Sequence, residues 1–227
     1  MIDVHAHVLP GVDDGSLNLD QTLCLLKKLK DEGVTDVICT PHLRGKYRAE
    51  RSEIEQAFID TKKLISDNGL DIKIHLGREV YASKHYRENI KNFLATYPSN
   101  KHVLVEFDFN KECEIAEVVY ELARLGYVPV LAHPERYRYL SVDDVLEIRL
   151  MGALVQINAQ SITKPLTREW VFVNKLFKEN LVDFVASDIH YGRKCHYLKA
   201  RKIVEKKYGK TVAEDVFCNN AKKLIEG

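Results

Sequence analysis

Apolar positions follow two different spacings along the chain, and the two alternate. Short runs rich in valine and isoleucine are separated by longer segments in which apolar residues recur every three or four positions, as Leu23, Leu26 and Leu29 do. The short runs predict strands and the longer segments predict amphipathic helices. Strands are expected at residues 2–8, 34–40, 72–77, 102–107, 128–132, 154–157 and 182–187, and helices at 20–32, 50–68, 112–125, 143–151, 168–180, 198–208 and 212–225.

Seven strands that alternate with helices favour βα units around a parallel sheet. The sequence therefore predicts the α/β class, as a closed or nearly closed (β/α)7 barrel, with an open doubly wound sheet as the competing architecture. Residues 1–227 show no linker, internal repeat or low-complexity segment, so we expect a single domain. The oligomeric state stays open, a homo-oligomer included.

Charge and cysteine usage narrow the class of protein. The 34 Lys+Arg and 33 Asp+Glu residues give a formal net charge of +1, which offers no general attraction for nucleic acid or an acidic membrane. Five cysteines without a CxxC pair are typical of reduced cytosolic thiols. The start MIDVHAH lacks a signal pattern, and no apolar run approaches ~18 residues. We expect a cytoplasmic protein with no direct membrane insertion and no nucleic-acid partner.

Side chains that can bind metal gather where the predicted strands end. The first strand carries the sequence Asp3-Val4-His5-Ala6-His7, and residues two apart in a strand point to the same side. His5 and His7 can therefore reach one ion together. Further candidates stand at the other strand ends or on a turn: Asp14, His42, Glu79, Glu106, His133, Asp188 and His190.

In a barrel these strand ends converge on one face, which is where active sites are built. Imidazole and carboxylate without thiolate suit catalytic manganese, iron or zinc more than a structural zinc. These nine candidate ligands are more than one ion needs. We therefore expect two or three ions, with a carboxylate such as Glu79 as a bridge. Taken singly, His42 or His133 is more often a core histidine, Glu106 an ion-pair partner, and Asp14 a turn residue.

Six motifs, in this order, carry a family resemblance: DVHAHVLPGVDDG, TPH, GREVY, VEF, AHPERY and SDIH. With them the chain resembles the PHP (polymerase and histidinol phosphatase) superfamily, and most of all its bacterial protein-tyrosine-phosphatase branch from capsular and exopolysaccharide gene clusters. The resemblance implies a distorted (β/α)7 barrel of the PHP type. It also implies two to three divalent metal ions, manganese first, with iron, zinc, magnesium or cobalt as other options.

The same resemblance assigns roles to individual residues. His5, His7 and Asp188 would bind the first ion, and Glu79 would bridge it to the second. Glu106 and His133 would complete the second ion, and the third would be held by Asp14, His42 and His190. Two arginines would contact the substrate phosphate: Arg136, three residues after His133, and Arg193, in a loop about two residues shorter than the family's usual version.

The function implied is hydrolysis of phosphotyrosine by attack of metal-bound hydroxide, on a protein substrate such as a bacterial tyrosine autokinase that controls capsule or exopolysaccharide synthesis. Arginine also suits phosphate without the resemblance, because its guanidinium presents a planar fork of donors. The sequence has no Cys-x5-Arg loop, which argues against a cysteine nucleophile. Four tyrosines near the motifs are candidates to frame the substrate ring: Tyr47, Tyr81, Tyr137 and Tyr191.

Three other functions stay open. A PHP phosphoesterase acting on a small metabolite such as histidinol phosphate would use the same metal ligands. An amidohydrolase-like enzyme that cleaves C–N bonds is a second possibility, although the paired arginines and the number of carboxylates favour phosphate. A metal-binding scaffold without catalysis is disfavoured by the full set of ligands. Turnover of phosphotyrosyl peptides compared with histidinol phosphate separates the first possibility from the tyrosine-phosphatase interpretation.

Overall fold

The computed structural model describes residues 1–82 and 96–226, and in this part of the chain every strand pairing is parallel. All seven predicted strands are confirmed: β1 (Ile2–Ala6), β2 (Asp36–Cys39), β4 (Lys73–Leu76), β6 (His102–Glu106), β7 (Val128–Ala132), β8 (Leu154–Asn158) and β9 (Phe184–Ala186). Two short strands were not predicted. They are β3 (His42–Leu43) and β5 (Glu79–Tyr81), which resume the paths of β2 and β4 after brief breaks.

The strands form one sheet in the order β1-β2-β4 and a second in the order β3-β5-β6-β7-β8-β9. The two sheets meet at a seam between β1 and the residues after β9. There Ala6 bridges Ile189, and Asp188 N donates to His5 O at 2.9 Å. When β2 and β3 are counted as one path and β4 and β5 as another, the strands follow one another in sequence order, as in a barrel, and the predicted α/β class is confirmed. The ladder of the described strands is interrupted, so the barrel is distorted.

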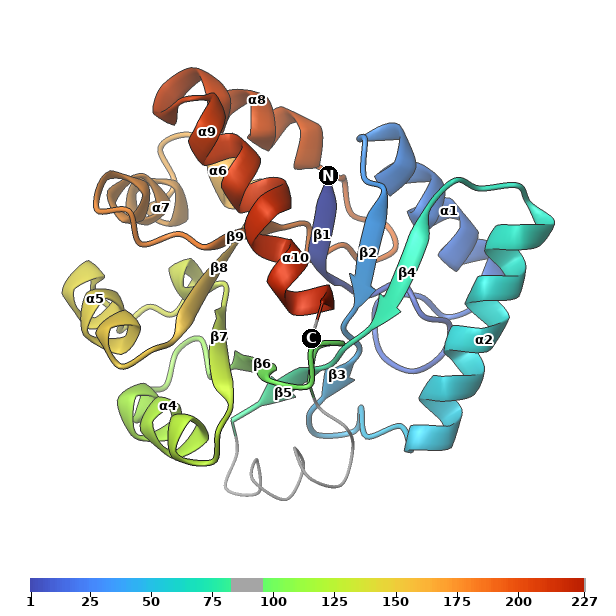
Figure 1. Cartoon of the computed structure of the whole chain (residues 1–227), viewed down its shortest axis with the longest axis horizontal. Coiled ribbons are helices and arrows are strands. Elements are labelled where there is room, and N and C mark those ends of the chain that lie inside the picture. The colour runs from blue at the N-terminus through green and yellow to red at the C-terminus, as the bar shows by residue number, and fades with distance from the viewer. Residues whose placement is uncertain (83–95, 227) are drawn as a thin grey trace.

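Helices surround the strands (Figure 1). Six match predicted segments: α1 (Leu19–Asp31), α2 (Arg51–Asp67), α4 (Ile115–Arg124), α5 (Val142–Leu150), α7 (Arg168–Lys178) and α8 (Tyr197–Tyr208). Each buries an apolar stripe, although in α1 the buried leucines are Leu25, Leu26 and Leu29, whereas Leu23 is partly exposed. The Asn18 side chain starts α1 by accepting from Gln21 N at 3.0 Å.

The last predicted helix, 212–225, is not a single α-helix. It consists of α9 (Lys210–Glu214), a π-helical segment η2 (Asp215–Asn219) and α10 (Asn220–Ile225). The short helices α6 (Ala159–Thr163) and η1 (Pro134–Arg136) were also not predicted. In the part of the chain that is described, no helix combines the length and the apolar character that crossing a membrane requires.

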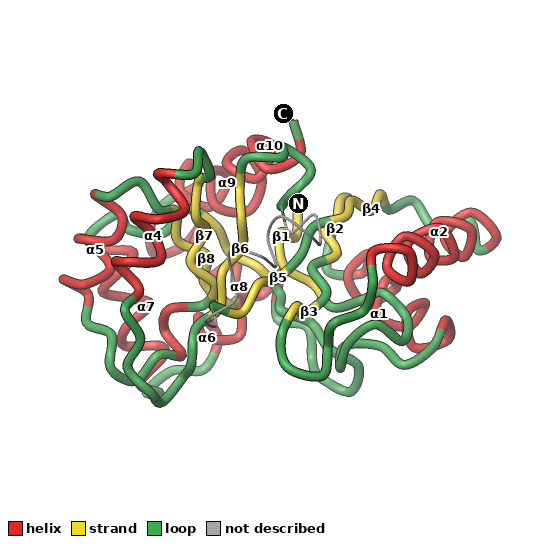
Figure 2. Tube along the Cα trace, turned by 90° about the horizontal axis from the view of Figure 1, so that it is seen from below, coloured by secondary structure: helices red, strands yellow, loops and turns green. Residues whose placement is uncertain are grey.

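The space inside the strands is apolar at one end and polar at the other. Val4, Leu104, Val130 and Phe184 form an inner cluster, which α10 covers with Ala221 and Leu224. Figure 2 shows α10 at one end of the strands and β3 toward the other. Because side chains alternate along a strand, the residue two positions after an inner apolar residue faces the same interior. Glu106 follows Leu104 in this way, and Gln156 follows Leu154.

Candidate metal centre

His5 and His7 leave β1 with their imidazoles directed at each other. The two Nε2 atoms are 3.0 Å apart, and both rings are buried. His5 Nδ1 lies 3.0 Å from Gln156 Oε1, and His7 Nδ1 lies 2.7 Å from Asp13 Oδ2. Since both partners are acceptors, each Nδ1 carries the proton and each Nε2 presents its lone pair. Two lone pairs at this distance repel, so the pair needs a proton or a metal ion between them.

Two carboxylates complete the surroundings of these nitrogens. Glu79 Oε2 is 3.3 Å from His5 Nε2 and 3.4 Å from His7 Nε2, and Asp188 Oδ1 is 3.7 and 3.5 Å from the same atoms. Burial alone would lower the pKa of His5, but Glu79 and Asp188 raise it to about 8. The carboxylates therefore favour positive charge at this point, whether a proton or a metal ion carries it.

Glu79 is shared by several histidines. Its Oε1 lies 3.1 Å from His133 Nε2, and its Oε2 lies 2.7 Å from His42 Nδ1 without hydrogen-bond geometry. Glu106 Oε1 is 3.9 Å from His133 Nε2, while its Oε2 accepts from Arg44 Nη1 at 2.7 Å. Burial lowers the pKa of His133 to about 4, so its ring is neutral, as a metal ligand must be. The position of Glu79 between these rings suits the bridging role expected of it.

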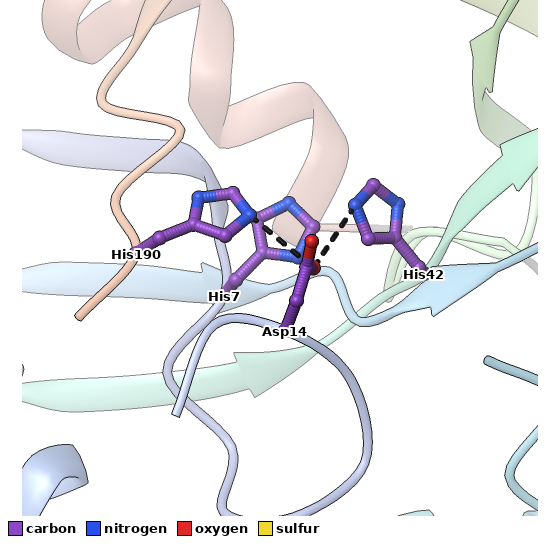
Figure 3. A group of neighbouring side chains, drawn as sticks. All are labelled: His7, Asp14, His42 and His190. Atoms are coloured by element: carbon purple, nitrogen blue, oxygen red, sulfur yellow. Dashed lines mark ion pairs between the residues drawn. The ribbon is translucent and has the colours of Figure 1, made fainter. Parts of the chain in front are cut away.

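The third cluster of candidate ligands is drawn in Figure 3, where Asp14 lies between His42 and His190 with His7 behind. Asp14 Oδ1 is 3.4 Å from His42 Nε2 and 3.5 Å from His190 Nε2. His190 Nδ1 donates to the Asp188 carbonyl oxygen at 3.0 Å, so this ring too presents Nε2 inward. The rings of His7 and His190 stack with centroids 4.3 Å apart. Asp14 is the most exposed member, with 40% of its side chain accessible.

The structure brings all nine predicted ligands together. Their donor atoms form four overlapping groups, each within 4.8 Å: His7, Asp14, His42 and His190; His5, Glu79 and His133; His5, His7 and Asp188; His42, Glu79 and Glu106. The donors are imidazole and carboxylate throughout, which fits divalent transition metals. How the ligands are divided among ions stays a prediction.

Both predicted arginines line one cavity of about 540 Å³ beside Asp188. Arg136, from η1, places Nη1 3.2 Å from Asp188 Oδ2 and lies over the Phe109 ring, with its guanidinium carbon 4.0 Å from the centroid. Arg193 is exposed on the loop after His190. Two cations thus border the candidate ligands, and their contact with phosphate stays a prediction.

Three residues that support the site were not among the predicted site residues. Asp13 is buried and accepts from His7 Nδ1, from His42 N at 3.1 Å and from Gly15 N at 2.9 Å. Gln156 holds His5, and Asn158 Nδ2 donates to Asp188 Oδ2 at 2.8 Å. For Gln156 and Asn158 the available signal was a polar residue at the end of an otherwise apolar strand.

Cys39 is buried and Cys195 is partly buried, which decides whether either thiol could act as a nucleophile in phosphate chemistry. Burial raises the pKa of Cys195 to about 12 and that of Cys39 further still, so both thiols stay protonated near neutral pH. Neither is the activated nucleophile that a cysteine phosphatase requires.

Comparison with known proteins shows the family to which the chain belongs. A family model described as capsular polysaccharide synthesis, CpsB/CapC, matches residues 1–226. The chain is 30% identical to tyrosine-protein phosphatase CpsB of Streptococcus pneumoniae, over 99% of this chain and 98% of that protein. It is also 30% identical to tyrosine-protein phosphatase YwqE of Bacillus subtilis strain 168, over 92% and 85%.

Solved structures of known proteins are similar to this chain as well. A solved structure described among those of YwqE from Bacillus subtilis and CpsB from Streptococcus pneumoniae, unique metal-dependent tyrosine phosphatases, matches this chain. Its TM-score is 0.91 and its sequence identity 26%, over 99% of this chain and 94% of that chain. Histidinol phosphate phosphatase from Lactococcus lactis shares the fold, with a TM-score of 0.59 and 14% identity over 90% and 92%. The family indicated by the sequence motifs is therefore confirmed, and the chain belongs to the capsular polysaccharide synthesis family CpsB/CapC.

Proposed function

We propose that this protein is a metal-dependent protein-tyrosine phosphatase. The observation that carries the proposal is the orientation of His5, His7 and His190. Each has its Nδ1 held by an oxygen acceptor and its Nε2 directed into a space lined by carboxylates. Histidines fixed in this way are typical of metal ligands supported by a second layer of hydrogen bonds. The relatives CpsB and YwqE are named tyrosine-protein phosphatases, which points to the substrate.

The ions we propose are two or three manganese ions. His5, His7 and Asp188 would hold the first, Glu79 would bridge it to a second held by Glu106 and His133, and Asp14, His42 and His190 would hold the third. The ions, when bound, supply positive charge for the phosphoryl oxygens and lower the pKa of water. Iron, zinc, magnesium or cobalt would fit the same donors, so metal analysis of protein purified without chelators decides among them.

Arg136 is the proposed phosphate-binding residue, with Arg193 as its partner. The Arg136 guanidinium is held on two sides, by Asp188 and by the Phe109 ring, so little side-chain freedom remains to be lost when phosphate binds. About a third of the side chain stays accessible in the cavity that Arg193 also lines. A planar guanidinium in this position can donate two hydrogen bonds to one phosphoryl group.

We infer further that the substrate is a phosphotyrosine protein in the cytoplasm, such as a bacterial tyrosine autokinase that controls capsule or exopolysaccharide synthesis. The family description names capsular polysaccharide synthesis, which supports this partner. We also propose that residues 1–227 act as one domain. The main hydrophobic cluster supports this, because it draws residues from Ala6 to Phe217.

The test is turnover of a phosphotyrosyl peptide by protein stripped with EDTA and then supplied with Mn²⁺. The variant His133→Ala removes a candidate ligand. The matched control is His75→Ala on β4, whose histidine pairs with Asp36 and belongs to none of the metal-ligand groups identified in the described residues. We expect activity that disappears with EDTA, returns with Mn²⁺, persists in His75→Ala and is absent in His133→Ala.

Two other results would redirect the interpretation. Turnover of histidinol phosphate in preference to the peptide would favour a metabolite phosphatase. Activity that persists in EDTA-stripped protein or in His133→Ala would contradict a role for the proposed metal centre.

A further inference from the structure

A cavity of about 450 Å³ adjoins the metal centre beside Glu106, and aromatic side chains form much of its wall. Tyr47, Tyr81 and Phe109 line it, together with Arg44. Three contacts connect the cavity to candidate metal ligands. The Tyr47 ring stacks on His42 with centroids 6.0 Å apart, the Phe109 ring meets His133 edge-on at 5.8 Å, and Arg44 pairs with Glu106.

Local structure holds these rings in place. Arg44 N donates to Tyr47 O at 3.1 Å and Tyr47 N donates back to Arg44 O at 2.8 Å, which closes a tight turn at Gly45, whose φ is +51°. The turn sets Tyr47 against His42. Tyr81 is held as well: its Oη donates to Asp108 Oδ2 at 3.3 Å, and Asp108 Oδ1 accepts from Asn110 N and Lys111 N at 2.9 and 2.8 Å. The wall is thus ordered before any ligand enters.

The two cavities beside the metal centre differ in aromatic content. The cavity beside Asp188 is lined by Arg136, Arg193 and Lys164, and among the described residues its lining includes no aromatic side chain. The aromatic cavity also has charged lining residues: Arg44, which pairs with Glu106 at 2.7 Å, Lys46, whose Nζ lies 4.9 Å from the Tyr47 ring centroid, and Asp108. A phosphomonoester has an anionic end and an organic end, and these two environments match the two ends separately.

We propose that the aromatic cavity is the subsite for the aryl ring of the substrate, with Tyr47, Tyr81 and Phe109 as the residues that contact the ring. This inference rests on the proposed phosphatase function. Aromatic pairs favour offset or edge-to-face contact, and three aromatic lining residues offer such contacts to one inserted ring. The subsite would make the enzyme prefer aryl over alkyl phosphomonoesters.

The two other candidate tyrosines do not belong to this subsite. Tyr137 is fully buried, with its hydroxyl donating to Ala132 O at 2.7 Å and accepting from Phe107 N at 3.1 Å, so it joins the ends of β6 and β7. Tyr191 is half exposed on the loop after His190 and does not line the cavity.

The test compares phenylphosphonate with methylphosphonate, two probes that share the anionic end and differ in the ring. Their binding to the Mn²⁺-loaded protein is measured by calorimetry, independently of turnover. The variants are Tyr47→Leu and Tyr81→Leu, with Tyr47→Phe as the conservative replacement. The control is Tyr120→Leu, on the exposed side of α4, where 59% of the residue is accessible.

We expect the wild type to bind phenylphosphonate about tenfold more tightly than methylphosphonate. Tyr47→Leu and Tyr81→Leu should each reduce this ratio about three- to tenfold and leave methylphosphonate affinity unchanged. Tyr47→Phe and Tyr120→Leu should keep the wild-type ratio.

A ratio near one in the wild type would overturn the subsite, and so would a ratio that neither leucine variant changes. Loss of methylphosphonate affinity in the leucine variants would also overturn it, because the tyrosines would then act through the metal centre. Turnover of the phosphotyrosyl peptide is recorded in parallel. A wild type that hydrolyses the peptide but does not discriminate the probes would refute the subsite alone, whereas discrimination without hydrolysis would refute the phosphatase function alone.

Discussion

Replacing Asp13 by asparagine tests how the metal centre is supported. The Asp13 carboxylate receives three hydrogen bonds, two of them on Oδ2 from His7 Nδ1 and His42 N and one on Oδ1 from Gly15 N. An asparagine has one oxygen and one NH₂ group. In its better orientation the oxygen takes the place of Oδ2, and the NH₂ group then opposes the Gly15 N–H. One buried donor loses its partner, and His7 loses a charged acceptor.

The magnitude follows from these contacts. A buried donor left without a partner costs about 1–3 kcal/mol, so we expect Asp13→Asn to lower the free energy of unfolding by about 2 kcal/mol. Burial would raise the pKa of Asp13, but His7 lowers it, so the native carboxylate is charged and increases the basicity of the imidazole. Loss of such a supporting group reduces metal affinity about 10- to 100-fold.

The measurements are calorimetric titration of metal-free protein with Mn²⁺ and urea unfolding of the same samples. Asp71→Asn is the matched control, because Asp71 is an exposed carboxylate paired with Lys30 and precedes β4, whereas the candidate ligand Glu79 follows that strand. A Kd for Mn²⁺ within about threefold of wild type, with an unchanged unfolding free energy, would refute the claim that Asp13 holds His7 for metal binding.

Three further predictions use the same assays. In Gly15→Ala the new Cβ would stand 2.1 Å from His7 O, so the His7 backbone must move. We expect this variant to lose at least as much Mn²⁺ affinity as Asp13→Asn loses, and wild-type affinity would contradict this. Leu224→Ala, at the end of the barrel opposite the metal centre, should lower the free energy of unfolding in urea by about 2–5 kcal/mol while Mn²⁺ affinity changes little. A parallel loss of Mn²⁺ affinity would show that the two ends of the barrel are coupled. Mn²⁺ at about 100 times its Kd should stabilise the wild type against unfolding by about 2.7 kcal/mol for each site filled, and His133→Ala markedly less at the same concentration.

Much of the fold could be predicted because it follows from local patterns. β-branched runs located the seven predicted strands, and helical periodicity located the helices that cover them. The segments β3 and β5 could not be found in this way. They are two and three residues long, and they are strands only because β3 pairs with β5 and β5 pairs with β6. The π-helical stretch in 212–225 packs against β9, and helical periodicity alone does not distinguish it from an α-helix.

The candidate site was predictable where chemistry and strand position coincide. His5 and His7 share one side of a strand, and Glu106 follows an apolar run, so the barrel hypothesis alone brought them together. Asp13 was harder to assign, because an Asp-Asp-Gly sequence is equally typical of a turn. Which of the two aspartates faces the interior depends on the close approach of Gly15 to the His7 backbone, a tertiary contact that the sequence does not reveal.

The position of α10 has a consequence for how the protein is made. Ala221 and Leu224 of α10 complete an inner cluster to which β1 contributes Val4. The first strand therefore shares one core with a helix that comes after β9, the last of the described strands. While the ribosome is still translating the segment after β9, the inner cluster remains uncovered at that end. If residues 1–227 fold as the one domain proposed above, the barrel consolidates only after α10 has emerged, because domains fold as units. We therefore expect stable metal loading to follow synthesis of this helix and not to accompany the appearance of His5 and His7.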